Sequence, residues 1–167
     1  MKLLHAVLPM ALLAAGGILQ SAEPPRFGVQ GAISAPAGDL SDSSNLGLQL
    51  GGHAKWDFRY GQGLMARADL TLYGAKDGIS TTAFGGGADY LYHVDQDQLG
   101  FYLLAGLTFL NYNFSGANHP DSSSGFGVDA GVGYDLDEHV GGQVRFTSHN
   151  QDGSTLSALN FGVTYTF

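Results

Sequence analysis

The sequence predicts an all-β chain that folds as one eight-stranded antiparallel up-and-down barrel. The first observation is period-two alternation of apolar and polar residues in successive segments of about ten residues. The second is that turn-forming residues separate these segments, whereas no window has a helical period of similar quality. The third is length, because 167 residues are enough for one domain and too few for two comfortable ones.

The N-terminal segment precedes the barrel. Lys2 supplies a positive charge, Ala6 to Leu19 is apolar and uncharged, and small or polar residues follow up to Ala22. This apolar run is too short for a membrane-spanning helix and is typical of a secretory signal peptide. We expect residues 1–22 to be a signal peptide cleaved after Ala22, and residues 23–167 to form the barrel domain.

The first four strands follow directly. Arg26 to Ala35 alternates Phe, Val and Ile with Gly, Gln and Ala, and Leu46 to Phe58 alternates Leu, Ala and Trp with Gly, His and Lys. Leu64 to Tyr73 sets Leu and Ala against Arg, Asp and Thr, and Thr81 to Tyr92 sets Phe and Tyr against Gly and Asp. Each segment therefore has one apolar face and one face of small or charged residues.

The last four strands include the least and the most regular segments. In Gly100 to Tyr112, Leu104 and Leu110 lie on the face opposite the other leucines. Phe126 to Asp135 alternates without exception, and Val140 to His149 follows the same pattern. The closing strand runs from Thr155 to the terminal phenylalanine, with large apolar residues at odd positions.

The connections are expected to alternate in length. Residues 35–45, 74–80, 113–124 and 150–154 are longer and rich in Ser, Asp, Asn, Gly and Pro, whereas tighter turns lie near residues 60–63, 95–98 and 137–139. One end of the barrel would then carry all the long loops. Symmetric hairpins about Gln62 and Asp137 would define the register of two strand pairs.

The composition of the second face indicates which face points outward. It combines many of the 26 glycines with charges of both signs, which suits the narrow interior of an eight-stranded barrel. The apolar face gathers aromatic residues at the strand ends, among them Trp56, Phe58 and Tyr134, as expected of interfacial girdles around an apolar band. We therefore expect a transmembrane barrel with lipid outside. A soluble lipocalin-like barrel with the apolar face inside is the less favoured alternative.

Taken together, the signal peptide, the eight amphipathic strands and the terminal Tyr165-Thr166-Phe167 resemble the small outer-membrane β-barrels of the OmpA/OmpX type. The resemblance covers the mature chain and implies a monomer in the bacterial outer membrane, with both termini periplasmic and the long loops outside. It also implies outer-membrane lipid and lipopolysaccharide as partners. The barrel-assembly machinery would recognise Phe167, with Val163 and Tyr165 on the same face.

Charged residues on the inward face are expected to form a lumen network, because buried charges need partners. The candidates are Lys55, Asp57, Arg67, Asp69, Asp89, Asp129 and Arg145, and Asp135 shares their face. Symmetric hairpins would pair Asp129 with Arg145, Lys55 with Asp69, and Asp57 with Arg67. A structural role is favoured over conduction, because small barrels have filled interiors.

Other functions have weaker support. A net charge of −8 with seven Lys and Arg leaves no basic surface for nucleic acid, and the absence of cysteine excludes thiolate metal sites. Ser148 and His149 superficially resemble a lipid A deacylase motif, but adjacent strand residues point to opposite faces. We expect a non-enzymatic barrel without cofactor or metal, having a structural or surface-interaction role and at most a narrow solute passage. An outer-membrane lipid-modifying enzyme is the alternative.

Overall fold

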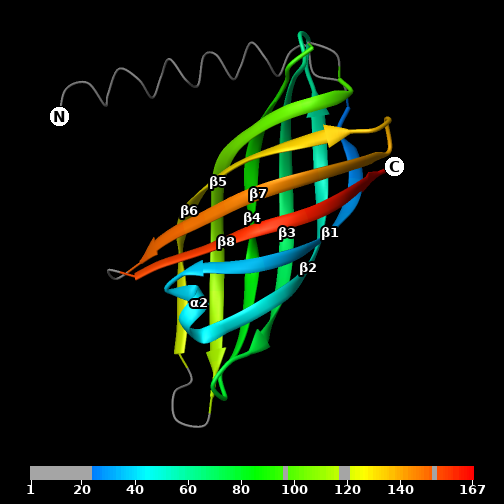
Figure 1. Ribbon diagram of the computed structural model, residues 1–167. Helices are drawn as coiled ribbons and strands as arrows, with labels where there is room; N and C mark the ends of the chain where they lie inside the picture. Colours follow the sequence, from blue (N-terminus) through cyan, green and yellow to red (C-terminus); the bar gives the residue numbers. More distant parts are fainter. Residues whose placement is uncertain (1–23, 96–97, 117–120, 152–153) are drawn as a thin grey trace, which may run out of the picture.

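The computed structural model describes residues 24–95, 98–116, 121–151 and 154–167, and these form a closed β-barrel (Figure 1). Strand follows strand around the barrel in chain order, and β1 closes it by pairing with both β2 and β8. The strands are β1 (Arg26–Gly38), β2 (Ser44–Asp57), β3 (Gln62–Ala75), β4 (Ser80–His93), β5 (Gly100–Ser115), β6 (Asp121–Asp135), β7 (Val140–Gln151) and β8 (Ser154–Thr166). The predicted eight-stranded antiparallel up-and-down fold is confirmed. The expected signal peptide lies outside the described residues.

The only described helix, α2 (Leu40–Ser43), is a single turn between β1 and β2 that the sequence pattern did not predict. It lies at the end of the barrel opposite the C-terminus (Figure 1). We call these two ends the α2 end and the C-terminal end. No helix among the described residues is long and apolar enough to span a membrane.

The predicted alternation of long and short connections is wrong. The strands extend further toward the α2 end than expected, so that β3 ends at Ala75 and β4 begins at Ser80. Lys76 and Ile79 pair across that connection, and Asp77 and Gly78 both have positive φ, so the hairpin closes tightly. The Ser- and Asn-rich composition of these segments predicted loops. Their backbone groups instead gain hydrogen bonds to the neighbouring strands when the strands continue.

The apolar face points outward, as predicted. Large side chains on this face are exposed on all eight strands, for example Phe27, Leu48, Phe126 and Val163. Phe58 is an exception, because it is buried at the β2–β3 turn and does not belong to the expected aromatic girdle.

Two hairpin registers differ from the symmetric ones expected. In β2–β3, Trp56 pairs with Leu64, which centres the turn on Tyr60 instead of Gln62. Tyr60 and Gly61 both have positive φ, and the Phe58 N–H donates to the Gln62 carbonyl oxygen at 2.8 Å. In β6–β7 the centre lies one residue after Asp137, because the Asp137 carboxylate accepts the N–H groups of His139 and Val140, each at 2.7 Å. These shifts change which charges face each other.

Candidate functional site

The barrel interior holds a central network built around Arg67 of β3. Its guanidinium contacts three carboxylates: Asp69 on β3, Asp89 on β4 at 3.1 Å, and Asp129 on β6 at 2.5 Å. The Arg67 side chain is 2% exposed, and the three carboxylates are equally well buried. Because β3 and β6 are not neighbours in the barrel, the Arg67–Asp129 contact spans the lumen.

Arg145 is the second cation of the central network. It contacts Asp89 at 3.1 Å, and its guanidinium also donates to the Gln143 side-chain oxygen at 3.2 Å. The expected cross-strand pair of Arg145 with Asp129 is wrong, because Arg145 pairs with Gly131 and Asp129 with Thr147. The central network therefore sets two arginines against the three aspartates Asp69, Asp89 and Asp129.

Neutral side chains add hydrogen bonds to two of the three carboxylates, whereas Asp89 Oδ1 and Arg145 Nε have no hydrogen-bond partner among the described residues. The Thr147 hydroxyl donates to Asp129 at 2.5 Å, and the Gln30 amide donates to Asp69. Asp129 and Asp69 thus each accept from an arginine and from a neutral donor. Donors on both sides of a buried carboxylate reduce its desolvation cost.

An end network lies nearer the C-terminal end. Lys55 donates to Asp135 at 2.7 Å and lies 3.8 Å from Asp57, which also pairs with Arg26. Both ring nitrogens of His93 face acceptors, namely the Gly61 carbonyl oxygen and Asp135, each at 3.1 Å. This network joins β1, β2, β4 and β6.

The two other expected pairs are therefore also wrong. Lys55 lies opposite Met65 instead of Asp69, and Asp57 lies opposite Gly63 instead of Arg67. The turn centred on Tyr60 moves each partner by four residues. The seven predicted lumen residues all lie in the interior, but the structure divides them between two networks. Lys55 and Asp57 belong to the end network and the other five to the central network.

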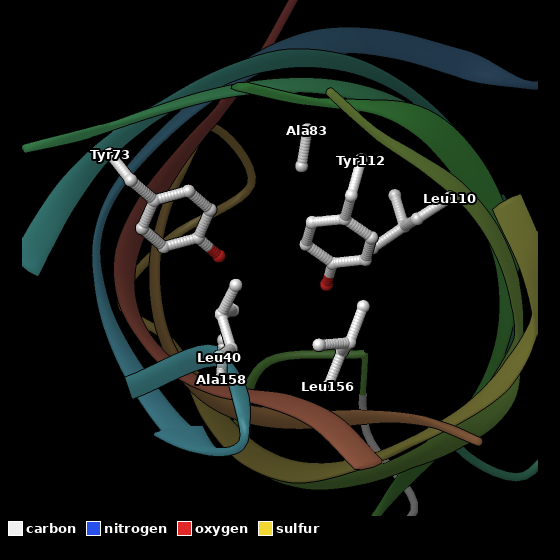
Figure 2. Packing of buried hydrophobic residues seen from close by; sticks show 7 residues of the cluster. All are labelled: Leu40, Tyr73, Ala83, Leu110, Tyr112, Leu156 and Ala158. Carbon is white, nitrogen blue, oxygen red and sulfur yellow. The ribbon is translucent and has the colours of Figure 1, made fainter. Parts of the chain in front are cut away.

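Two apolar clusters separate and cover the charges. The small apolar cluster, between the end and central networks, consists of Met65, Leu91, Tyr102 and Leu104. The large apolar cluster fills the α2 end, where its side chains point inward from several walls and from α2 (Figure 2). Its members are Leu40, Tyr73, Ala83, Leu110, Tyr112, Leu156 and Ala158.

The order of these layers can be followed along single strands. The inward residues of β4, from the C-terminal end, are His93, Leu91, Asp89, two glycines, Ala83 and Thr81. From the C-terminal end to the α2 end, the layers are therefore the end network, the small apolar cluster, the central network and the large apolar cluster. Leu104 and Leu110, which made the fifth predicted strand irregular, belong to the two apolar clusters.

Inward glycines make room for the large interior side chains. A Cβ on Gly133 would collide with the Tyr102 ring, and one on Gly127 would lie 2.7 Å from the His149 ring. A Cβ on Gly87 would lie 3.1 Å from the Arg67 guanidinium. The glycine-rich face of the sequence is thus the complement of its aromatic and arginine side chains.

Sequence reasoning missed Arg26, Gln30 and His93 as members of the networks. His93 was one of several scattered histidines, yet it shares the inward parity of Asp89 and Leu91 on the same strand. Gln30 similarly shares the inward face of β1 with Ser34. Strand parity would have found both residues, whereas residue type alone did not.

Ser148 and His149 are arranged as adjacent strand residues must be. The Ser148 hydroxyl lies 2.9 Å from the Ser157 hydroxyl, whereas the buried His149 ring packs edge-on to Tyr112 at 5.9 Å. Within the described ranges, no group of three or more His, Asp or Glu side chains could hold a metal ion.

The closing strand presents the three residues of the expected assembly signal on the outer surface. Val163, Tyr165 and Phe167 are exposed, and the Tyr165 and Phe167 rings meet edge-on at 5.5 Å. The Phe167 N–H donates to the Phe27 carbonyl oxygen at 2.8 Å, so the chain end is held to β1. Recognition of this surface during assembly remains a prediction.

Sequence comparison supports the architecture. Residues 6–167 match the family model described as "Outer membrane protein beta-barrel domain". No curated protein matches the chain in sequence.

Several solved structures share the fold. The chain is similar to Ail of Yersinia pestis, solved with the heparin analogue sucrose octasulfate, at 16% identity and a TM-score of 0.58, covering 87% of this chain and 100% of Ail. It is similar to Neisserial surface protein A at 19% identity and a TM-score of 0.57, covering 87% and 99%. The N-terminal barrel of Pseudomonas aeruginosa OprF gives 12% identity and a TM-score of 0.53, covering 86% of this chain and 99% of OprF's barrel.

Proposed function

The chain belongs to the outer membrane protein beta-barrel domain family, and we propose that it serves in the outer membrane as a closed barrel with a structural or surface-interaction role. The observation that carries this proposal is the filled lumen. Two ionic networks and two apolar clusters occupy the interior in alternating layers. A solute would have to displace both buried ion pairs and packed aromatic side chains, so no open passage is expected.

Conductance tests the closed lumen directly. The mature protein is extracted from outer membranes, where it should migrate differently with and without boiling, and is then inserted into planar bilayers. We expect no long-lived conductance steps. Stable open steps from a protein that retains the heat-dependent gel shift would refute the closed barrel, because the same folded molecule would then conduct.

We further propose that the barrel is not an enzyme. The support is that Ser148 and His149 face opposite sides of β7, which separates this candidate nucleophile from its candidate base. Mass spectrometry of lipid A from cells with and without the expressed protein should give identical profiles. A change that disappears in Ser148→Ala would revive the lipid-modifying alternative.

The α2 end should not attract polyanions such as the ligand in the Ail structure. Asp39, Asp42 and Asp77 lie in its connections, and Lys76 is the only lysine or arginine there. The Lys76 ammonium also donates to the Ser41 carbonyl oxygen at 2.5 Å. We therefore expect no measurable binding of sucrose octasulfate by calorimetry at physiological salt. Micromolar binding would mean that local geometry outweighs the acidic charge.

We propose that Phe167, with Val163 and Tyr165, directs assembly of the barrel in the membrane. All three side chains are exposed at the end of the closing strand, where the barrel-assembly machinery can contact them. Phe167→Ala should lower the amount of folded protein in the outer membrane, while purified protein refolds in detergent as well as wild type. Equal loss in both assays would indicate a stability role instead.

A closed barrel needs no partner strand, and we expect a monomer.

A further inference from the structure

One wall of the barrel continues beyond the apolar band as a surface of neutral polar side chains. On β4, β5 and β6 the outward residues change from apolar to hydroxyl or amide toward the α2 end. We call this surface the polar wall, and its residues are Thr82, Asn111, Asn113, Ser115, Ser122 and Ser124.

Strand pairing makes the polar wall one contiguous surface. Asn113 lies between Thr82 and Ser122 on the neighbouring strands, and Asn111 pairs with Ser124. The Asn113 amide donates to the Asn111 side-chain oxygen at 3.1 Å, which orients both amides along β5. Their remaining donor and acceptor atoms are available to a ligand.

The polar wall is continuous with the lipid-facing surface. Directly next to it stand Phe84, Phe109 and Phe126, which are 62%, 44% and 79% exposed. The Phe109 and Phe126 rings meet edge-on at 5.1 Å. Exposed aromatic residues at strand ends mark the boundary between acyl chains and headgroups in such barrels.

The opposite wall has a different composition. The outward residues of β1 and β2 toward the α2 end remain apolar, as in Ile33 and Leu46, which are 55% and 65% exposed. Exposed Asn150 of β7 and Thr155 of β8 continue the polar surface beyond β6, whereas Ile33 and Leu46 keep β1 and β2 apolar, so the polar surface does not run around the whole barrel.

We infer that the polar wall binds the sugar rings of lipopolysaccharide in the outer leaflet; this rests on the proposed membrane role and places the α2 end outside. Hydroxyl and amide groups match the neutral hydroxyls of a saccharide in both donors and acceptors. The wall holds no lysine or arginine, so it is unsuited to the phosphates that basic side chains recognise. The ligand chemistry is therefore neutral saccharide.

Stability in defined membranes tests this inference. Wild type is placed in nanodiscs of lipopolysaccharide with its core sugars, of lipid A without them, and of phospholipid alone. Unfolding in urea is followed by fluorescence of Trp56, the single tryptophan. We expect a higher unfolding midpoint with core sugars than with lipid A.

A triple variant assigns the effect to the polar wall. Thr82→Val, Asn113→Leu and Ser122→Ala remove polar groups from one row across three strands. A matched control, Ile33→Val with Leu48→Ala, changes a paired outward row of β1 and β2 on the opposite, apolar wall. The triple variant should lose the difference between core-sugar and lipid A membranes, and the control should keep it. If the triple variant does not fold, Asn113→Leu alone is used.

Three outcomes would overturn the inference. Wild type could show no dependence on core sugars, or the triple variant could retain it. Sedimentation could also show a dimer that the triple variant abolishes, which would make the wall a contact between copies. Open conductance would refute the closed lumen and would not affect these results, so the two proposals can fail separately.

Discussion

Replacing Arg67 by methionine should destabilise the barrel more than any other single charge removal in the central network. Arg67 is the one cation in contact with Asp69, Asp89 and Asp129 together, and its side chain is 2% exposed. Each contact represents a gross attraction of about 4 kcal/mol at a charge separation of about 4 Å and an effective dielectric constant of about 20. Desolvation of the ions offsets much of this attraction.

The net cost follows from what the substitution leaves behind. Arg67→Met leaves Arg145 as the only cation for three buried carboxylates. Removal of one partner of a buried pair typically costs about 3–5 kcal/mol, and three affected carboxylates place the expected loss at the upper end of that range. Urea unfolding of the purified barrel in detergent, followed by Trp56 fluorescence, measures the change in the free energy of unfolding.

A second variant separates charge from packing. In Arg67→Met with Asp69→Asn, one cation faces two carboxylates, and the new amide can still accept from Gln30. This variant should recover about 1–3 kcal/mol relative to Arg67→Met, as a coupled pair does in a double-mutant cycle. Arg59→Met, at an exposed turn residue, is the control and should change stability by less than about 0.5 kcal/mol. A cost below about 1 kcal/mol for Arg67→Met, or no recovery with Asp69→Asn, would refute the role of charge.

Three further changes test other layers of the barrel. Gly85→Ala should lower the free energy of unfolding by about 1–3 kcal/mol, because its Cβ would collide with the Phe109 carbonyl oxygen. In Gly142→Ala the nearest contact of the new Cβ is 3.8 Å away, so this substitution should be tolerated, and equal effects of the two in urea unfolding would contradict this. Tyr112→Ala should cost about 3–5 kcal/mol and should let ions pass, measured as bilayer conductance; unchanged stability would argue against packing in the large apolar cluster. The N–H groups of Val140 and then His139 hold the pKa of Asp137 below its usual value. The stabilisation by the Asp137 carboxylate is therefore present above its unfolded pKa of about 3.9 and is lost as the pH falls through its lower folded pKa. Asp137→Asn keeps an acceptor but does not titrate, so it should weaken the pH dependence of the urea midpoint between about pH 5 and about pH 3, the range around the unfolded pKa.

Strand number, facing and barrel closure could be predicted because they depend on local pattern. Side chains alternate across a pleated strand, so the parity of Phe126 and Asp129 alone assigns them to opposite faces. The extra length of β3 to β6 could not be predicted, because Ser and Asn in segments such as Ser122–Ser124 suggest loops in isolation. Pairing with a neighbouring strand overrides that preference.

The registers depend on turns that departed from ordinary preferences. Tyr60 adopts a φ of 62°, a conformation that bulky residues rarely take, so the rules of turn chemistry placed the β2–β3 turn later in the sequence. At β6–β7 a single carboxylate, that of Asp137, moves the centre by one residue. Each small change displaces every cross-strand pair along the hairpin by two residues or more.

The contacts of the central and end networks depend on closure of the barrel, and a single hairpin gives no information about closure. Symmetric hairpins predict pairs only between neighbouring strands. In the structure, Arg67 of β3 contacts Asp129 of β6, and Lys55 of β2 contacts Asp135 of β6. Such contacts form only when the wall curves far enough to bring distant strands within a side-chain length. The inward glycines permit this, because Gly87 and Gly133 leave space for Arg67 and Tyr102. The charges and the glycines are therefore two parts of one arrangement: a barrel of eight strands is narrow enough for its ions to pair across the lumen, and those pairs in turn occupy the space through which a solute would pass.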